Sequence, residues 1–421
     1  MRRLWHELTR PRGRKAMPFA GAGRRRSGER GLALLMVMAS IAIITVITVE
    51  LSYDGRVRLV KSAHERDKVA ARYLAESGAN IYRLILVADQ QISGALGGMM
   101  PEGMNVQGLW QMLPAVNTGL MRMLFTSGGS VDDGEIEEFQ QEGVSDEARE
   151  ESREEASKFS SKGFLDFEGD FEAEIKDMDG RINVNRLGRS CPGRTCPSIT
   201  ELQQDPIAQQ LYGLMSGEEN DQWFYEHNID RWEIIGNMAD WIDLDTNRVF
   251  RGGYEDSLYQ TLDDSYLSKN AQFDTLEEIR QVDGWQGEVY EKFGERLTVY
   301  GGGKINVNSA DNAALCGLLR AHTTTPGVLN DCDGFIERWQ SNELISFQSW
   351  TKGEEFVTSA QDRAGVVIDD PKKLADSISF ESKTFLVEST GLVGASAAKL
   401  TVVYDFTTSK KVGRIKYWRM D

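Results

Sequence analysis

The longest uninterrupted apolar stretch of the chain runs from Leu32 to Val49 and contains eighteen residues without a charged side chain. An α-helix of that length rises about 27 Å, at about 1.5 Å per residue, and the hydrocarbon core of a membrane is about 30 Å thick. A secretory signal peptide would have a shorter apolar region that ends in a small-residue cleavage site. Because the pattern continues here into a second helical segment, it predicts a membrane-spanning helix.

The second segment extends from about Leu51 to Val87, lacks proline, and carries apolar or small side chains at spacings of three and four residues. These positions are Ala70, Tyr73, Leu74, Ser77, Ile81, Leu84, Ile85 and Ala88. The two segments together predict one helix over residues 32–90, on the order of 80 Å long. A helix of that length is too long to be buried in one domain. We therefore expect its first half in lipid or in a filament, and its second half against a sheet.

The pattern changes to an alternation typical of strands in two distant parts of the chain. Residues 163–187 alternate apolar and polar positions around Phe167 and Phe171, and Ser382 to Phe406 reads as two strands joined by a turn that contains glycine. The intervening residues 188–381 are rich in helical signals and large apolar side chains. The sequence thus predicts an α+β fold in which a helix-rich domain is inserted into an antiparallel sheet, and the sheet is completed by residues 382–421.

A polar segment separates the long helix from the first strand. Residues 91–162 are rich in glycine and methionine and then in acidic side chains, and the run from Asp132 to Glu155 has hardly any aromatic or β-branched residues. Such composition buries too little apolar surface to fold by itself. We expect an acidic loop here, disordered in part.

The charges are distributed unevenly along the chain. Residues 1–31 form a basic leader, whereas the whole chain has a net charge of −17, so the part after the leader is strongly acidic. An acidic body repels phosphate backbones, which argues against nucleic-acid binding. The arginines precede the apolar run and the acids Glu50 and Asp54 follow it, so the positive-inside rule places the N-terminus in the cytoplasm. The body then lies on the far side of the membrane.

Four cysteines occur as two local pairs, Cys191 with Cys196 and Cys316 with Cys332. Two short disulfide loops suit an oxidising compartment. Reduced core thiols or a zinc site are the alternatives, although neither pair has the two-residue spacing common among zinc ligands.

The densest group of chemically useful side chains lies around residues 240–259. It comprises Asp240, Asp243, Asp245, Asn247, Glu255 and Asp256, with Gly252 and Gly253 between them. Ca²⁺ takes six to eight oxygen ligands in flexible geometry, so carboxylates separated by a glycine-rich turn are suitable ligands. The spacing differs from that of an EF-hand loop. By spacing alone, acidic helix caps and a solvated loop explain the group equally well.

Motifs for catalysis are scarce. The four histidines are His6, His64, His227 and His322, and none forms an H-E-x-x-H pair. The sequence contains neither G-x-S-x-G nor a Walker A phrase. We therefore expect a protein that is not an enzyme. A pair of carboxylates acting as in glycosidases stays open as an alternative, because it requires only two acids at a suitable separation.

The junction between the leader and the apolar helix carries a resemblance to a known family. The sequence ERG followed by LALLMVMASIAIITV resembles the leader of type IV pilins and of the pseudopilins of type II secretion systems. Most of these subunits have Glu at the fifth mature position, where this chain has Met36, and that difference is typical of the protein K family of minor pseudopilins. The phrases DMDGRINVN, ADWIDLDTN, GGYEDSLY and GKINVNSADNAAL are also similar to that family.

This resemblance has implications for processing, fold and metal binding. It implies cleavage after Gly31 by the prepilin peptidase, N-methylation of Leu32, and a type IV pilin-like fold. By position it implies that Asp243, Asp245, Glu255 and Asp256 hold Ca²⁺, with Asp240 at a helix end beside them. A second acidic phrase around Asp177, Asp179, Asn183 and Asn185 is interpreted as a turn rather than a further metal site.

The resemblance also implies a place in the cell and a set of partners. We expect a single-pass inner-membrane protein with its C-terminal domain in the periplasm, acting as a structural subunit at the tip of the type II secretion pseudopilus. The expected partners are the other minor pseudopilins, the major pseudopilin and the prepilin peptidase, with the secretin and exported proteins as further contacts. A minor pilin of a type IV pilus is the alternative within the same fold, and a membrane-tethered periplasmic hydrolase is the alternative from another class.

Overall fold

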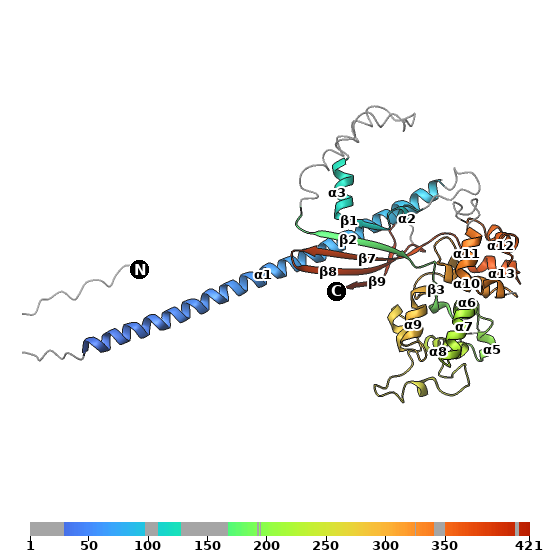
Figure 1. Cartoon of the computed structure of the whole chain (residues 1–421), viewed down its shortest axis with the longest axis horizontal. Helices are drawn as coiled ribbons and strands as arrows, with labels where there is room; N and C mark the ends of the chain where they lie inside the picture. Colours follow the sequence, from blue (N-terminus) through green and yellow to red (C-terminus); the bar gives the residue numbers. More distant parts are fainter. Residues whose placement is uncertain are drawn as a thin grey trace, which may run out of the picture. The chain divides into compact units, whose positions relative to one another are not determined.

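The computed structural model describes residues 29–96, 108–127, 167–191, 193, 195–324, 326–340, 350–408 and 412–421. The chain divides into two compact units, Met1–Ala63 and His64–Asp421. Helix α1 (Glu29–Leu96) is continuous across the boundary between them (Figure 1). It begins before Leu32 and extends past residue 90, so it is longer at both ends than the sequence predicts.

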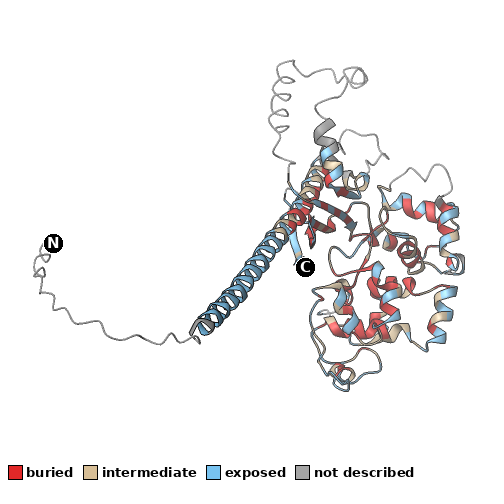
Figure 2. Ribbon diagram, turned by 60° about the vertical axis from the view of Figure 1, so that its left-hand side comes forward, coloured by how far each residue is buried: buried red, intermediate tan, exposed pale blue. Residues whose placement is uncertain are grey.

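The first half of α1 has an apolar surface with no protein neighbour in the described chain. Every large apolar side chain from Leu32 to Val60 is exposed, and Figure 2 shows this half of the helix in the colour of exposed residues. Hydroxyl groups in this stretch donate back to the helix, as Thr45 Oγ1 does to the Ile41 carbonyl at 2.7 Å. Such bonds satisfy polar groups without water. Among the described residues, α1 is the one helix long and apolar enough to cross a membrane.

The second half of α1 packs against a five-stranded antiparallel sheet. The strands are ordered β1-β2-β7-β8-β9, with bounds β1 (Ala115–Asn117), β2 (Asp170–Asp177), β7 (Thr384–Val393), β8 (Ser396–Asp405) and β9 (Arg414–Met420). Buried side chains of the helix, including Leu74, Tyr82 and Leu86, share one apolar core with Phe171 of β2 and Val387 of β7. The predicted α+β fold, with a long apolar helix on an antiparallel sheet, is confirmed.

Glycines allow the helix to approach the sheet closely. A Cβ on Gly391 of β7 would lie 2.0 Å from the Ala71 carbonyl oxygen, and one on Gly78 of the helix would lie 2.4 Å from Ser389 Oγ. Neither position has space for a side chain, so the backbones meet directly. This contact cannot be inferred from hydrophobic spacing, because glycine contributes nothing to that pattern.

Short elements occur inside the segment expected to be a loop. These are α2 (Leu109–Met112), β1 and α3 (Thr118–Ser127). Strand β1 pairs with β2, with Val116 opposite Ala173, and Val116 is buried in the core between helix and sheet. The assignment of 91–162 as a loop throughout is therefore wrong for this part, where one buried valine and an edge pairing were enough to form a strand. The acidic run 132–155 lies outside the described residues.

The sheet also differs from the prediction after β2 and at its C-terminal end. Strand β2 ends at Asp177, and β3 (Ile182–Asn183) pairs in parallel with β4 (Leu297–Thr298) instead of joining the main sheet. The Asp177 carboxylate accepts hydrogen bonds from the Asp179 and Gly180 backbone N–H groups at 3.0 and 3.2 Å, which turns the chain away. The hairpin expected over Ser382 to Phe406 is β7 and β8, and β9 is an additional strand.

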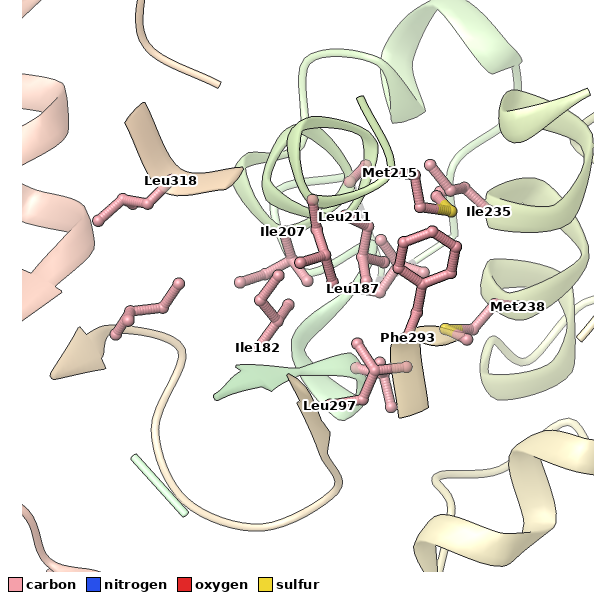
Figure 3. Packing of buried hydrophobic residues seen from close by; sticks show 14 of the residues in the cluster. Ile182, Leu187, Ile207, Leu211, Met215, Ile235, Met238, Phe293, Leu297 and Leu318 are labelled. Atoms are coloured by element: carbon pink, nitrogen blue, oxygen red, sulfur yellow. The ribbon is translucent and has the colours of Figure 1, made fainter. Parts of the chain in front are cut away.

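The residues between β2 and β7 contain nine further α-helices among the described residues, and a second apolar core. The helices are α5 (Ile199–Leu202), α6 (Pro206–Leu214), α7 (Glu218–Glu226), α8 (Arg231–Ile242), α9 (Glu288–Phe293), α10 (Asn312–Arg320), α11 (Cys332–Gln340), α12 (Gly353–Asp362) and α13 (Pro371–Ser377). Figure 3 shows part of this core, where Leu211 of α6 and Met215, the residue after this helix, lie near Ile235 of α8 and Phe293 of α9. We call the region from Met178 to Lys383 the insert.

The two copies of the sequence INVN occupy matching positions in the insert. The first two residues of the first copy form β3, and those of the second form β5 (Ile305–Asn306), which pairs in parallel with β6 (Ile378–Ser379). In each copy the first Asn accepts a hydrogen bond from the backbone N–H two residues later, at 3.0 Å. In each copy the second Asn donates to two distant backbone carbonyls and accepts from one distant backbone N–H. These asparagines therefore have a structural role as turn and cross-link residues.

The insert also contains both cysteine pairs, and the structure joins Cys191 to Cys196 and Cys316 to Cys332. In the chain-entropy account, cross-links that close loops of this size stabilise by about 2 and about 3 kcal/mol. We predict that Cys316→Ser/Cys332→Ser lowers the free energy of unfolding more than Cys191→Ser/Cys196→Ser does. Peptide mapping under non-reducing conditions, followed by denaturant unfolding, measures both. Free thiols throughout the protein isolated from cells would contradict the pairing.

Candidate metal centre

The candidate metal centre is built at the C-terminal end of α8 and the loop that follows. Asp230 caps the start of α8 by accepting from the Trp232 and Glu233 N–H groups at 2.9 and 3.4 Å. The helix is buried from Ile234 to Trp241 and packs Ile235 and Met238 into the insert core. Its last turn therefore brings Asp240 into the interior, with 3% of its surface exposed, and Asp243 follows at 5%.

The loop after α8 folds back as a tight hairpin. The Arg248 N–H donates to the Gly253 carbonyl at 2.9 Å, and the Glu255 N–H donates to the Thr246 carbonyl at 3.2 Å. The turn between them has positive φ at Arg251, Gly252 and Gly253, a conformation for which glycine is suited. This hairpin brings Glu255 beside the end of α8, although the two are separated by more than ten residues in sequence.

Three carboxylates converge at this point. Asp240, Asp243 and Glu255 are all buried, and one oxygen of each lies within 4.8 Å of the other two. Asp240 Oδ1 accepts from the Val249 N–H at 3.0 Å, and Asp243 Oδ1 accepts from the Asp245 N–H at 3.2 Å. Asp240 Oδ2, Asp243 Oδ2 and both oxygens of Glu255 are buried without a hydrogen-bond partner. Buried charged oxygens are rarely left without a partner, so these atoms are available to a ligand.

Burial and mutual repulsion disfavour the ionised forms of these acids. Burial raises the pKa of Asp240 and of Asp243 to about 7, and the neighbouring carboxylates contribute in the same direction. Burial, followed by the charges of Asp243 and Asp240, raises the pKa of Glu255 to about 8. A cation among the three carboxylates would remove this repulsion and favour ionisation.

The donor set fits a hard cation. All three converging side chains offer carboxylate oxygens, which suit Ca²⁺ and Mg²⁺ better than zinc, for which nitrogen and sulfur ligands are typical. Asn270 contacts the same loop, since its Nδ2 donates to the Asp245 carbonyl at 2.6 Å, and its Oδ1 is buried without a partner. Because Ca²⁺ takes six to eight oxygen ligands, further oxygens would have to complete the set of three carboxylates.

The structure brings together two of the four side chains predicted to be ligands. Asp243 and Glu255 are in the cluster. Asp256 instead accepts from Ser268 N and Ser268 Oγ at 3.0 and 2.9 Å, because its side chain points across the loop. Asp245 lies at the edge, where its Oδ1 accepts from the Asn247 N–H at 2.6 Å.

Asp240 takes the place in the cluster that was expected for Asp256. Its position three residues before Asp243 puts the two on the same side of the helix end, and this spacing was visible in the sequence. The second acidic phrase forms turns, as interpreted. There the Asp179 carboxylate accepts from the Lys383 and Thr384 N–H groups at 2.6 and 2.9 Å.

The processing residues belong to the other compact unit, Met1–Ala63. Gly31 and Leu32 are in the first turns of α1, and the side chain of Leu32 is exposed. Cleavage between these two residues stays a prediction.

Comparison with known proteins gives matches to one family. The family model "Type II secretion system (T2SS), protein K" matches residues 180–302. The type II secretion system protein K of Aeromonas hydrophila is 23% identical over 141 residues, which are 34% of this chain and 40% of that protein. The aligned region thus spans less than half of the curated relative.

A solved structure is also similar in part. It is a chain of the GspK–GspI–GspJ complex of the type 2 secretion system from enterotoxigenic Escherichia coli. The match has a TM-score of 0.45 and 18% identity, and it covers 60% of this chain and 80% of the other. The sequence match over residues 180–302, which include the carboxylate cluster, shows that this part of the chain is similar to protein K of type II secretion systems, and the predicted resemblance is confirmed.

Proposed function

We propose that this chain is a minor pseudopilin, a structural subunit of the pseudopilus of a type II secretion system. The observation that carries the proposal is the match of residues 180–302 to the protein K model. It is supported by the long N-terminal helix, whose first half is apolar and exposed and whose second half packs on a sheet. A single chain with both features suits a filament subunit that is stored in a membrane before assembly.

The charge pattern supports an orientation. Arg24, Arg25, Arg26 and Arg30 precede the apolar run and Glu50 follows it. Positive residues are retained on the cytoplasmic side, so the sheet and the insert lie in the periplasm. Disulfide bonds in the insert are compatible with that compartment.

The insert supports a place at the tip of the filament. A regular pilin stack repeats one small sheet domain per subunit, and an insert of about two hundred residues between two neighbouring strands would obstruct a subunit above it. At the tip no such neighbour exists. There the subunit would contact other minor pseudopilins and the major pseudopilin, and would support export of folded proteins through the secretin.

Ca²⁺ has a structural role in this proposal. Asp240, Asp243 and Glu255 hold the cation and thereby connect the end of α8 to the hairpin that follows. The cation supplies charge neutralisation. The chain's own residues fix the loop around it, through the Asp243 carboxylate on the Asp245 N–H and the Asn270 amide on the Asp245 carbonyl.

Processing of the N-terminus tests the proposed function. We expect the mature membrane protein to begin at N-methylated Leu32, because the basic leader, Gly31 and an uncharged helix occur in the order that a peptidase at the cytoplasmic face requires. Gly31→Asp should abolish cleavage and, in a strain lacking the native gene, should fail to restore secretion into the medium. Mass spectrometry of the N-terminal peptide and assay of the secreted proteins measure the two effects.

The same substitution at Gly55 provides a matched control, because Gly55 lies farther along α1 and a Cβ there would meet no atom within 4 Å. Gly55→Asp should be cleaved after Gly31 like the wild type. Retention of the leader in a protein that still supports secretion, or cleavage beyond Val49, would show that the proposed function is wrong.

A further inference from the structure

A cavity of about 580 Å³ in the insert is lined by an excess of cationic side chains. It lies among the turn after the first INVN copy, the start of α6, the residue before β5, and α13. The cations are Arg186, Arg189, Lys304, Lys372 and Lys373, and the acids are Asp205, Asp370 and Asp376. This balance is the reverse of that of the whole chain, which has 65 acidic and 48 basic side chains.

Three of these cations lack the carboxylate partners that are common elsewhere on the insert. Among the residues that the structure describes, Arg186, Lys304 and Lys372 form no ion pair. The Arg186 guanidinium donates to the Gly301 carbonyl at 2.8 Å. Many other cations of the insert are paired, as Lys292 is with Glu219 at 3.1 Å, although the exposed Arg363 also forms no ion pair among the described residues. In so acidic a chain, unpaired cations gathered in one cavity indicate a site for an anionic ligand.

The acids in the cavity are fewer than the cations, and three of their six carboxylate oxygens already accept hydrogen bonds from other groups. Asp205 Oδ1 accepts from the Ile207 and Ala208 N–H groups at 3.0 and 3.2 Å, and its Oδ2 accepts from Ser190. Asp370 Oδ1 accepts from the Lys372 and Lys373 N–H groups at 3.0 and 3.1 Å. Both aspartates are helix caps whose function is structural.

These caps also decide which kind of anion fits. A compact phosphate binds most readily to free backbone N–H groups at a helix start, and here the starts of α6 and α13 are occupied by Asp205 and Asp370. The available donors are separate cationic head groups on different elements. The stem of Arg186 packs within 3.4 Å of the Cβ position of Gly303, which brings it beside Lys304, whereas Lys372 is on α13. Spaced point charges match a row of carboxylates along an extended peptide.

We propose that this cavity binds an acidic segment of a partner protein, with Arg186, Lys304 and Lys372 pairing to its carboxylates. The rest of the body repels an acidic protein, so the cavity fixes where and in which orientation such a partner docks. The inference rests on the charge and contacts of the insert and is independent of the proposed secretion role.

Fluorescence anisotropy of a labelled octaglutamate peptide, titrated with the full chain in detergent, tests the proposal. We expect saturable binding at 50 mM NaCl that weakens at least fivefold at 300 mM, since exposed charges are screened by salt, and no binding of a neutral octaserine peptide. Lys304→Glu/Lys372→Glu should weaken octaglutamate binding at least tenfold, and Lys304→Gln/Lys372→Gln should weaken it to an intermediate degree.

A control variant with the same change in net charge distinguishes binding in the cavity from general attraction between the protein and the peptide. Arg363 and Arg414 are exposed cations outside the cavity, so Arg363→Glu/Arg414→Glu should leave the affinity within about twofold of the wild type. Thermal melting of each variant establishes that it is folded. Equal weakening by the control, absence of octaglutamate binding at 50 mM NaCl, or displacement of the peptide by micromolar inorganic phosphate would each overturn the proposal.

Discussion

At free calcium 1,000-fold above the dissociation constant, the protein is expected to be about 4.1 kcal/mol more stable than in chelator, because a cation that binds only the folded state adds RT ln(1 + [L]/Kd). The effect follows from three buried carboxylates whose oxygens lie within 4.8 Å of one another. Magnesium should stabilise less, since it prefers octahedral geometry and releases its waters reluctantly. Thermal or denaturant unfolding of the full chain in detergent, with and without each ion, measures the difference.

Two variants separate the cluster from the surrounding acidic loop. Asp243→Asn/Glu255→Gln should lose most of the calcium-dependent stabilisation and should exceed the wild type in stability when chelator is present, because two buried like charges are removed. Asp263→Asn, an exposed acid in the same loop, should respond to calcium as the wild type does. A melting temperature that is indifferent to both chelator and calcium would exclude the metal centre and leave the fold unaffected.

Asn185→Ala is expected to lower the free energy of unfolding by at least about 3 kcal/mol. The buried amide donates to the Phe273 and Val299 carbonyls at 2.9 and 2.8 Å and accepts from the Phe273 N–H at 2.8 Å. Alanine would leave three buried backbone groups without partners, and each such group costs about 1–3 kcal/mol. Equilibrium denaturation, monitored by near-ultraviolet circular dichroism of the insert tryptophans, measures the loss.

The second copy of INVN offers a graded comparison. Asn308 makes the same kinds of bonds, to Trp350 and Phe380, but is half-buried. Asn308→Ala should therefore cost less, about 2 kcal/mol, since water can replace some of the lost bonds. Asn330→Ala, at an exposed position, should change stability by about 0.5 kcal/mol or less. If Asn185→Ala were no more harmful than Asn330→Ala, the cross-linking role would be excluded.

The parts of the fold that were predictable carry strong local patterns. The apolar run after Gly31 and the three-and-four spacing up to Ala88 were enough to predict α1, and alternation predicted β2, β7 and β8. Strand β1 was missed because three residues inside a glycine-rich segment give no periodicity, and its pairing with β2 depends on tertiary contact. The sequence placed Ile182 and Asn183 in the main sheet, whereas they form β3 and pair with β4. This difference depends on the hydrogen bonds that the Asp177 side chain accepts, and a hydrophobic pattern gives no information about such bonds.

The candidate site was predictable in its location and only partly in its geometry. The density of acids around a glycine turn left a metal site and a solvated loop equally open, the family resemblance favoured calcium, and of the four expected ligands Asp243 and Glu255 lie in the cluster. Asp256 was expected as a ligand by its position in the family resemblance, but adjacent residues of a 3₁₀ turn (Glu255–Leu258) point in different directions, and Ser268 donates to the Asp256 carboxylate. Asp240 was assigned to a helix end and lies in the last turn of α8. Its place in the cluster follows from the burial of that turn, which depends on tertiary packing and cannot be inferred from local sequence.

The pairing of β2 with β7 has a consequence for the order of folding. Asp179 binds the N–H groups of Lys383 and Thr384, which are 204 and 205 residues away along the chain. Closing a loop of that length by diffusion of an unfolded chain is slow and entropically costly. An insert that folds first brings its own two ends together, so that the pairing of β2 with β7 no longer requires diffusion of a long unfolded loop. We therefore expect the insert to act as the folding nucleus, and the central sheet that holds the long helix to form last.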